Sequence, residues 1–310
     1  MALDACKTVT DARGRELVEH GTVLFPVGCY HDDLEEHHVP WHWHEELEAV
    51  VVEVGTVTVS AGGESRTLGP GEGVFVGAEV LHGVWRAAAG ACRLHSLVFH
   101  PRLVGGSLDS IFYQGYVQPL LADTGHSGAL WLDGSELWHR EALEAIESGW
   151  QSCIREPMGY EFLVREALSR LVVLLVENRP AAEKRPTEKM LRDEGRIKTM
   201  LQYINAHLGE ELTTARIARC AAISESECLR CFRSMVGSTP IRYVRTLRIY
   251  KAAELLAATD QKIADIGTQC GFQEMSYFVK SFREIKGCSP LEYRRKKQRQ
   301  GASTPGMNEG

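Results

Sequence analysis

Long apolar segments are missing from this chain of 310 residues. Its longest apolar run, Leu171–Val176, falls far short of the roughly 18 residues that a membrane-spanning helix needs. The start also lacks the basic stretch followed by an apolar core that marks a secretory signal. Nine cysteines without an export signal are typical of reduced thiols. We therefore expect a cytoplasmic protein with no membrane partner.

Histidine is scarce in the last part of the chain, since 11 of the 12 histidines precede residue 140. That part is instead basic. From Arg196 to Gln300 it holds 19 Lys and Arg against 10 Asp and Glu, which leaves a net charge of −15 on the rest. This asymmetry indicates a polyanion partner for the basic module alone, although chance clustering on a solvated face gives the same count.

The length and the changes in pattern predict an α+β multidomain protein. Short β-branched runs broken by glycine, from Thr22 to Phe99, favour a β-sandwich or barrel. Helical periodicity follows in Leu137–Ile154 and Phe162–Val176. The expected divisions are a sensor barrel (1–130), a helical segment (131–178), a linker (179–195), an all-α domain (196–297) and a disordered tail (298–310).

A repeat of fifty residues is the strongest signal in the chain. Residues 232–243 and 282–293 both read F-R-x-x-x-G-x-[ST]-P-x-x-Y. In each copy the Phe ends the buried face of a helix, and the Gly closes that helix in the left-handed conformation. The Ser or Thr then caps the next helix, which Pro begins. Fixed-period similarity of this kind indicates one structural unit used twice.

Each repeated unit reads as helix, turn, helix. Short helices at Thr213–Ala221 and Lys262–Gln269 precede a second helix with a narrow apolar stripe and a basic outer face. Pro240–Ala257 joins the units as one helix of roughly 27 Å, which suits two readers about one DNA turn, 34 Å, apart. A plain bundle of repeated helical hairpins is the alternative.

Residues 196–295 resemble the AraC/XylS family of transcription regulators. The segments that carry the resemblance are Ile263–Gly267, Cys270–Phe272, Tyr277-Phe278, Phe282 and Gly287–Arg294. Two positions depart from the family pattern. Gly267 stands where alanine is usual, which weakens the helix by up to about 1 kcal/mol. Ala222 stands where glycine is usual, which predicts left-handed strain in the first turn.

The resemblance implies double-stranded DNA as partner and supplies the base-contacting positions. In the first reader they are Ser226, Leu229, Arg230 and Arg233. In the second reader they are Gln273, Glu274, Met275, Ser276 and Lys280. Arg230 suits a bidentate contact to guanine, Gln273 suits adenine, and Leu229 and Met275 suit thymine methyl groups. Arg294–Arg299 suit phosphate rather than bases.

The front half carries His42-x-His44-x-x-x-Glu48, and His82 follows a second strand-like run. The pattern resembles the cupin barrel, in which three His and one Glu bind a divalent metal. Along one unbroken strand, His42, His44 and Glu48 would share a face. The set suits Zn, Fe, Ni or Mn. A bound metal, an organic effector touching these side chains and Trp41, and a purely structural role all remain open.

Partners and rival functions follow from these patterns. The apolar stripe Leu163, Ala167, Leu171, Leu174 and Leu175 predicts either a homodimer or packing onto the barrel. Cys228-x-x-Cys231 is interpreted as part of a helix core rather than a metal or redox site. We expect a non-enzymatic regulator that responds to a small-molecule effector, with RNA polymerase a candidate partner. The rival is a metal-dependent cupin enzyme with an appended helical domain.

Overall fold

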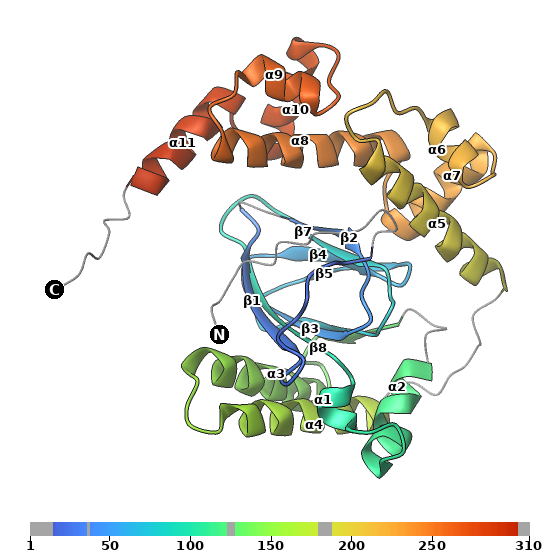
Figure 1. Ribbon diagram of the computed structural model, residues 1–310, viewed down its shortest axis with the longest axis vertical. Coiled ribbons are helices and arrows are strands. Elements are labelled where there is room, and N and C mark those ends of the chain that lie inside the picture. Colours follow the sequence, from blue (N-terminus) through green and yellow to red (C-terminus); the bar gives the residue numbers. More distant parts are fainter. Residues whose placement is uncertain (1–14, 36–37, 123–127, 179–187, 303–310) are drawn as a thin grey trace. The chain divides into compact units, whose positions relative to one another are not determined.

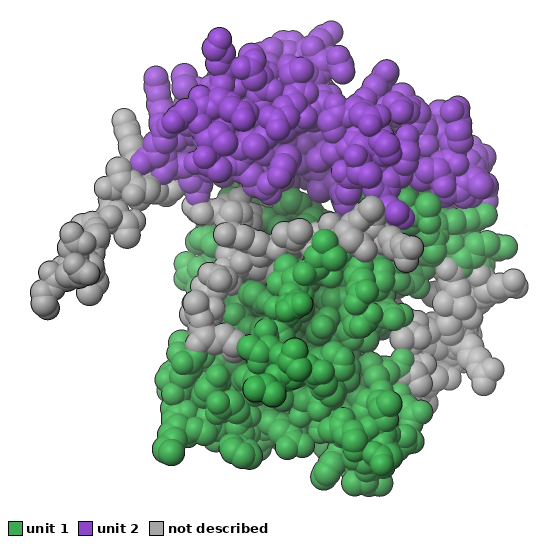
Figure 2. All heavy atoms as spheres, viewed as in Figure 1, with its two compact units in different colours: residues 1–201 green, residues 202–310 purple. Residues whose placement is uncertain are grey.

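The computed structural model describes residues 15–35, 38–122, 128–178 and 188–302. The chain forms two compact units, residues 1–201 and residues 202–310, shown in Figure 2. Across the described ranges, every helix is too short or too polar to cross a membrane.

Two antiparallel sheets build the first unit (Figure 1). The five-stranded sheet has the order β1 (Val27–Asp33), β8 (Arg93–Phe99), β3 (Leu47–Val54), β6 (Gly73–Val76) and β9 (Ala129–Leu132). The four-stranded sheet has the order β2 (Val39–His42), β7 (His82–Arg86), β4 (Val57–Ala61) and β5 (Glu64–Leu68). The predicted β front half is confirmed. Because β9 ends at Leu132, the sheet runs slightly past the expected division at residue 130.

Side chains that alternate along the strands fill two separate layers. Val50 and Val52 of β3 point between the sheets and pack with Val57 and Val59 of β4. Ala49, on the opposite face of β3, belongs to the layer that the helices cover. Burial on both faces explains why β3 reads as a nearly continuous apolar run rather than as an alternating pattern.

Helices cover the outer face of the five-stranded sheet. The longest are α3 (Leu137–Arg155) and α4 (Tyr160–Asn178), and shorter ones are α1 (Arg102–Gly105), η1 (Tyr113–Val117) and α2 (Gln118–Ala122). Ala167, Leu171 and Leu175 of α4 are buried in this layer. Most of the stripe that the sequence offered to a second subunit is therefore used inside the chain, which is the packing alternative.

Two expected irregular segments contain helix. The helix α5 spans Glu188–Ala206, so residues 188–195 of the predicted linker are helical. Ile197 and Met200, near its middle, are fully buried, and this packing overrides the polar local sequence. The helix α11 runs from Pro290 to Ala302 and extends into the predicted disordered tail. Residues 179–187 and 303–310 lie outside the described residues.

The second unit is helical. Its remaining helices are α6 (Thr214–Cys220), α7 (Glu225–Cys231), η2 (Phe232–Val236), α8 (Pro240–Ala258), α9 (Ile263–Gln269) and α10 (Met275–Lys286). The repeat forms as its sequence predicts. Gly237 and Gly287 are left-handed, with φ of 67° and 75°. The Thr239 hydroxyl accepts a hydrogen bond from the Arg242 backbone and caps α8.

The second copy of the repeat carries a fuller cap than the first. The Ser289 hydroxyl accepts a hydrogen bond from the Glu292 backbone at 3.3 Å. The Glu292 carboxylate in turn accepts hydrogen bonds from the backbone N–H and the hydroxyl of Ser289 at 2.7 and 2.6 Å. This reciprocal arrangement is a capping box, which satisfies two otherwise unpaired donors at the start of α11.

Aromatic residues of the repeat form the junctions between helices. The ring of Phe282 lies 5.5 Å from that of Tyr293, and Phe232 lies 6.0 Å from Tyr243. In the first copy the helix widens into η2 after Cys231, so that Val236 is buried while Met235 is only partly covered. The wider π-turn rotates the last apolar position by about one residue.

Candidate nucleic-acid interface and metal centre

The candidate base-contacting side chains of the first reader lie on α7 and, for Arg233, on η2. Those of the second reader lie on α10 or, for Gln273 and Glu274, directly before it. The exposed ones are Ser226, Arg230, Arg233, Gln273, Glu274, Ser276 and Lys280, and the half-buried ones are Leu229 and Met275. On the inner face, Cys228, Cys231, Phe278 and Phe282 are fully buried. The expected division into an apolar inner face and a polar outer face is present in both units, and the two cysteines are core residues.

The helix α8 joins the two readers. Its 19 residues make it about 28 Å long, and Figure 1 shows α6 and α7 near one end and α9 to α11 near the other. Arg245 of α8 donates to Glu284 of α10 at 2.9 Å. The second reader is thus tied to the connecting helix by an ion pair as well as by its core.

The Arg230 side chain forms an ion pair with a residue of its own helix. Its guanidinium lies 3.7 Å from the Glu227 carboxylate one turn earlier, and both side chains are about half exposed, at 51% and 41%. An exposed pair of this kind contributes little to stability, so it orients the guanidinium without locking it away from a base.

The turns between the paired helices share one backbone design. Ile223 donates to the Ala218 carbonyl and Ala222 to that of Arg219, each at 3.1 Å. Phe272 and Gly271 make the equivalent bonds in the second unit. Ala222 has a φ of 53° where Gly271 has 85°, so the predicted left-handed strain is present.

Gly267 permits a close helix crossing. A β-carbon built there would lie 2.9 Å from the Met275 Cε and 3.1 Å from the Phe278 ring. The departure from the usual alanine therefore lets α10 approach α9 closely. It also explains why Met275 is half-buried, because its methyl group packs on the glycine.

Four buried side chains converge at one end of the space between the sheets. The nearest ligand atoms of His42, His44, Glu48 and His82 all lie within 4.8 Å of one another. They do not share a strand as predicted, because β2 ends at His42 and β3 begins at Leu47, which leaves His44 in the connection. The cluster forms because His42 pairs with His82 across β2 and β7, while Glu48 reaches inward from β3 in the facing sheet.

The backbone orients all three imidazole rings. In each ring Nδ1 lies within hydrogen-bond distance of a nearby carbonyl: Pro40 for His42 at 2.8 Å, Glu46 for His44 at 3.1 Å, and Val80 for His82 at 2.7 Å. A carbonyl only accepts, so Nδ1 is the donor and Nε2 of a neutral ring carries the lone pair. The Glu48 carboxylate lies 2.8 Å from Nε2 of His82 and 3.4 Å from Nε2 of His44.

This arrangement fits a divalent metal ion. Histidine ligands of metals commonly donate their other ring N–H to a carbonyl, which fixes both the tautomer and the ring orientation. Ligands about 2.1 Å from a tetrahedral zinc ion lie roughly 3.4 Å apart, close to the His44–Glu48 separation. Three imidazoles and one carboxylate also suit Fe, Ni and Mn.

The protonation of the cluster is strongly perturbed. Burial alone would raise the pKa of Glu48, but hydrogen bonds with His44 and His82 hold that pKa well below its ordinary value. Burial lowers the pKa of His42 to about 3, and the neighbouring His82 adds to the effect. Burial opposes a charge on His82 too, yet its hydrogen bond with Glu48 raises its pKa. A positive charge on His82 and a negative charge on Glu48 therefore stabilise each other.

Trp41 does not join the cluster. It follows the side-chain alternation to the face opposite His42, where its ring lies 5.2 Å from that of Trp85. The Trp85 ring packs against Gly83, where a β-carbon would lie 2.6 Å from that ring and 3.3 Å from the Trp41 backbone nitrogen. Trp41 is buried, at 2% exposure, and its contact with Trp85 gives it a packing role, while its part in a ligand site stays a prediction.

Glu16 and His20 are functional candidates that the sequence did not reveal. Both are buried, and Nε2 of His20 lies 3.2 Å from the Glu16 carboxylate. The same Glu16 oxygen lies 3.7 Å from Nε2 of His42. Their four-residue spacing is the only sequence signal, and it is common on surfaces.

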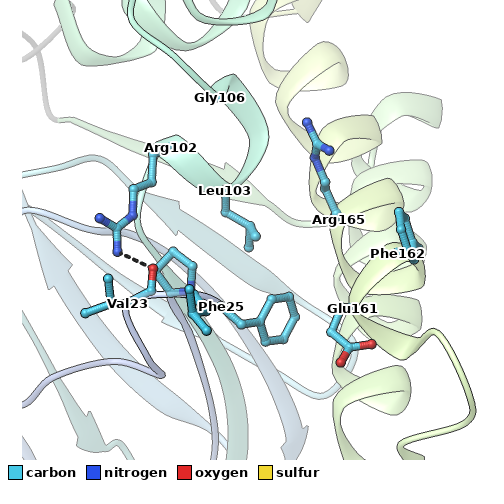
Figure 3. Close-up of a pocket in the computed structure, with 10 residues that line it drawn as sticks. Val23, Phe25, Arg102, Leu103, Gly106, Glu161, Phe162 and Arg165 are labelled. Atoms are coloured by element: carbon cyan, nitrogen blue, oxygen red, sulfur yellow. Dashed lines mark hydrogen bonds between the residues drawn. The ribbon is translucent and has the colours of Figure 1, made fainter.

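A groove lies outside the barrel, between the segment Val23–Pro26 and the helices α1 and α4. Its volume is about 480 Å³. Figure 3 shows Phe25 and Leu103 between Arg102 on one side and the side chains of α4, including Phe162, on the other. Arg102 donates to the Val23 carbonyl at 3.0 Å. None of the four clustered residues lines this groove.

Comparison with known proteins accounts for both units. Residues 217–296 match the helix-turn-helix domain, and residues 25–145 match the AraC-like ligand binding domain. A repeated helix-turn-helix unit with outward polar faces, together with a barrel of this kind, defines a DNA-binding transcription regulator that carries a ligand-binding domain.

The chain belongs to the AraC family of transcriptional regulators. It is 31% identical over 290 residues to the uncharacterized HTH-type transcriptional regulator YdeC of Bacillus subtilis (strain 168), covering 93% of this chain and 98% of that protein. It is 25% identical to the HTH-type transcriptional activator RhaS of Enterobacter sp. (strain 638), covering 89% and 96%. The solved DNA-binding domain of AdpA, in complex with a target DNA, is 28% identical over 34% of this chain and 95% of that chain, with a TM-score of 0.33. The two domain matches and the similarity to YdeC confirm the resemblance to the AraC/XylS family.

Proposed function

We propose that this regulator reads two neighbouring major-groove segments of one DNA duplex and that occupancy of its barrel site changes its affinity for DNA. The observation that carries the DNA part is the exposure of the polar faces of both α7 and α10, each backed by a buried aromatic or thiol core. The length of α8 suits reader helices that enter successive turns of the major groove.

Specificity is proposed to come from a few side chains. Arg230 pairs with guanine and Gln273 with adenine, while Leu229 contributes apolar contact to a thymine methyl group. The methyl group of Met275 packs on Gly267, so only the remaining, exposed part of its side chain is proposed to contact a base. The remaining candidates, which position the readers and complete their contacts, are Ser226, Arg233, Glu274, Ser276 and Lys280.

Selection of bound sites from random duplex DNA tests the DNA part directly. The expected result is a site with two short determinants about one helical turn apart. Arg230→Ala is then expected to weaken binding by about 1–3 kcal/mol and to relax preference at one base pair. Arg295→Ala is the matched control, because that exposed arginine is assigned to phosphate and its loss leaves base preference unchanged. Recovery of random sequences, or unchanged preference in Arg230→Ala, would refute the assignment.

A divalent ion held by His42, His44, Glu48 and His82 is proposed as the resident of the barrel site. When bound, such an ion supplies a fixed positive centre that can also hold an oxygen or nitrogen donor of an effector. The protein's part is to orient the rings through backbone carbonyls and to provide the carboxylate charge. Elemental assay of protein purified without added metal is expected to find one ion per chain, and His82→Ala is expected to lose it.

The coupling of the barrel site to DNA binding rests on differential affinity. A ligand shifts DNA binding only by as much as it prefers one state of the protein to the other. DNA affinity measured with saturating metal and with chelator is expected to differ by five-fold or more, on the order of a 1 kcal/mol coupling. Equal affinities with metal, chelator and a panel of added metabolites would remove the regulatory part and leave the DNA part standing.

An enzymatic role is the alternative, and only the four-residue cluster favours it. Turnover of a bound substrate by the metal-loaded chain, abolished in Glu48→Gln, would support it. We propose instead that this chain uses the site for sensing, in line with relatives named as transcriptional regulators and activators. For the same role we propose a cytoplasmic location, with RNA polymerase as the partner in activation.

Homodimerisation is proposed through the groove rather than through the buried stripe of α4. Leu24 and Phe162 at its rim are 95% and 77% exposed. Exposing large apolar side chains to water is unfavourable in a monomer, and such patches often mark protein–protein interfaces. Glu161 and Arg165 lie one turn apart on the same rim, so two copies related by a two-fold axis can pair opposite charges. Light scattering is expected to give a dimer that Phe162→Glu converts to a monomer. A monomeric parent protein would overturn this proposal.

A further inference from the structure

A buried acidic residue ahead of the barrel is not explained by the proposed four-residue metal centre. Glu16 precedes β1, and its side chain is only 1% exposed. Its backbone N–H donates to the Trp43 carbonyl at 2.9 Å, and Arg15 forms a parallel bridge with Trp43. The segment Arg15–His20 is therefore attached by its backbone to the connection that carries His44.

Both buried side chains of this segment face the metal centre. The Glu16 carboxylate lies 3.7 Å from Nε2 of His42. The ring of His20 lies 5.5 Å from that of His44, and its Nδ1 lies 2.7 Å from the Tyr30 hydroxyl. Tyr30 thus fixes the ring of His20, and Nε2 of His20 lies 3.2 Å from the Glu16 carboxylate. The contacts form a continuous chain from Tyr30 to His42.

The contact between Glu16 and His42 favours a cation beside it. Nδ1 of His42 donates to the Pro40 carbonyl, so Nε2 of the neutral ring carries a lone pair. That lone pair and an anionic oxygen then lie 3.7 Å apart inside the protein, where two acceptors repel each other. A positive ion at the Nε2 atoms of the cluster converts this repulsion into attraction.

Charge balance points the same way. A divalent ion with Glu48 as its only carboxylate leaves one positive charge buried between the sheets, which is costly. A second carboxylate within a few ångströms cancels it. The segment that supplies this carboxylate lies before β1 in the chain, so its packing on the barrel is sensitive to the charge that it meets there.

We infer that Glu16 is the second carboxylate of the metal centre and that metal binding and packing of the segment Arg15–His20 on the barrel stabilise each other. This inference rests on the metal ion proposed above. By reciprocity, whatever loosens the segment weakens metal binding by the same factor. The packing of the backbone segment Arg15–His20 therefore depends on whether the metal centre is occupied.

The test measures metal affinity and backbone protection together in the full-length chain. Zn²⁺, Ni²⁺ and Mn²⁺ are each titrated in competition with a chromogenic chelator, and amide hydrogen exchange of residues 15–20 is followed with and without the ion. The variants are Glu16→Gln, the matched control Glu19→Gln on the exposed side of the same segment, and His82→Ala, which lacks a ligand.

The expected result is slower exchange of the segment when metal is bound, in the parent chain and in Glu19→Gln. Glu16→Gln is expected to bind metal 10- to 100-fold more weakly, the range found when a group outside the ligand set is removed, and to lose the metal-dependent protection. His82→Ala is expected to show neither binding nor protection.

The outcomes separate the inference from the metal proposal. If the parent chain binds metal but the exchange of residues 15–20 does not change, the inference is wrong and the metal centre stands; this readout needs no variant to fold. Equal metal affinity in Glu16→Gln and Glu19→Gln also overturns it. If the parent chain binds none of the three ions, the metal centre and the inference fall together.

Discussion

Replacing Ala222 with glycine tests the account of the first helix-turn-helix unit. A residue with a β-carbon costs about 1–2 kcal/mol in the left-handed region, and Ala222 has a φ of 53°. Glycine removes that cost but adds about 0.4–1 kcal/mol of flexibility to the unfolded chain. Because Ala222 is exposed, no packing is lost. The net expectation is that the variant is about 0.5–1 kcal/mol more stable than the parent chain.

The second helix-turn-helix copy offers the reverse substitution as a matched control. Gly271 makes the same backbone hydrogen bond at a φ of 85°, and a β-carbon there would lie 2.8 Å from the Arg248 guanidinium. That guanidinium donates to the Leu208 carbonyl at 2.9 Å, so moving it endangers a charge-assisted bond. Gly271→Ala is therefore expected to lower the free energy of unfolding of the helical unit, residues 202–310, by about 2 kcal/mol.

The chain provides an internal reference for the measurement. All six tryptophans lie within residues 1–201, so tryptophan fluorescence follows the unfolding of that unit only. Far-ultraviolet circular dichroism also follows the unfolding of the helical unit, residues 202–310, which contains both Ala222 and Gly271. Ala222→Gly is expected to raise the midpoint of the dichroism transition of that unit by roughly 3–6 °C and to leave the fluorescence transition in place. An unchanged or lowered dichroism midpoint would refute the strain argument.

Three further predictions use the same measurements. Gly267→Ala gains about 1 kcal/mol of helix propensity but places a β-carbon 2.9 Å from Met275, so a net loss of about 1 kcal/mol in the dichroism transition is expected; a gain would show that α10 moves aside freely. Ser289→Ala removes the capping box with Glu292 and should lower the same midpoint by about 5 °C, whereas an unchanged midpoint would mean that α11 adds nothing to the unit. Chelation of metal held at 100 times its dissociation constant removes about 2.7 kcal/mol, so the fluorescence midpoint should fall by roughly 5–10 °C, and no fall is expected in His82→Ala.

Local pattern was sufficient for the second unit. The sequence motif that ends one helix and begins the next consists of residues close together in the chain, such as Gly237, Thr239 and Pro240. These residues adopt the backbone conformations that their side chains favour. The limits of α9 and α10 follow from the same local rules. The strain at Ala222 was predicted from the family resemblance, because glycine is usual at that position, and the φ of 53° confirms it.

The barrel site depends on contacts between distant segments, and sequence reached only part of it. His42, Glu48 and His82 come from three strands in two sheets, which no local period encodes. Their residue types identified the cluster, but an unbroken strand was the wrong reason for it. Glu16 was missed because a lone buried carboxylate resembles any surface glutamate until its neighbours are placed around it.

The carbonyls of Pro40, Glu46 and Val80 each lie within two residues of the histidine that they orient. A carbonyl cannot be deleted by substituting its own side chain. Drift in surrounding side chains can thus reshape the walls of the barrel while the three rings keep their aim. A designer who wishes to change what the barrel senses has freedom around the rings, provided that the loops preceding β7 and following β2 keep their course.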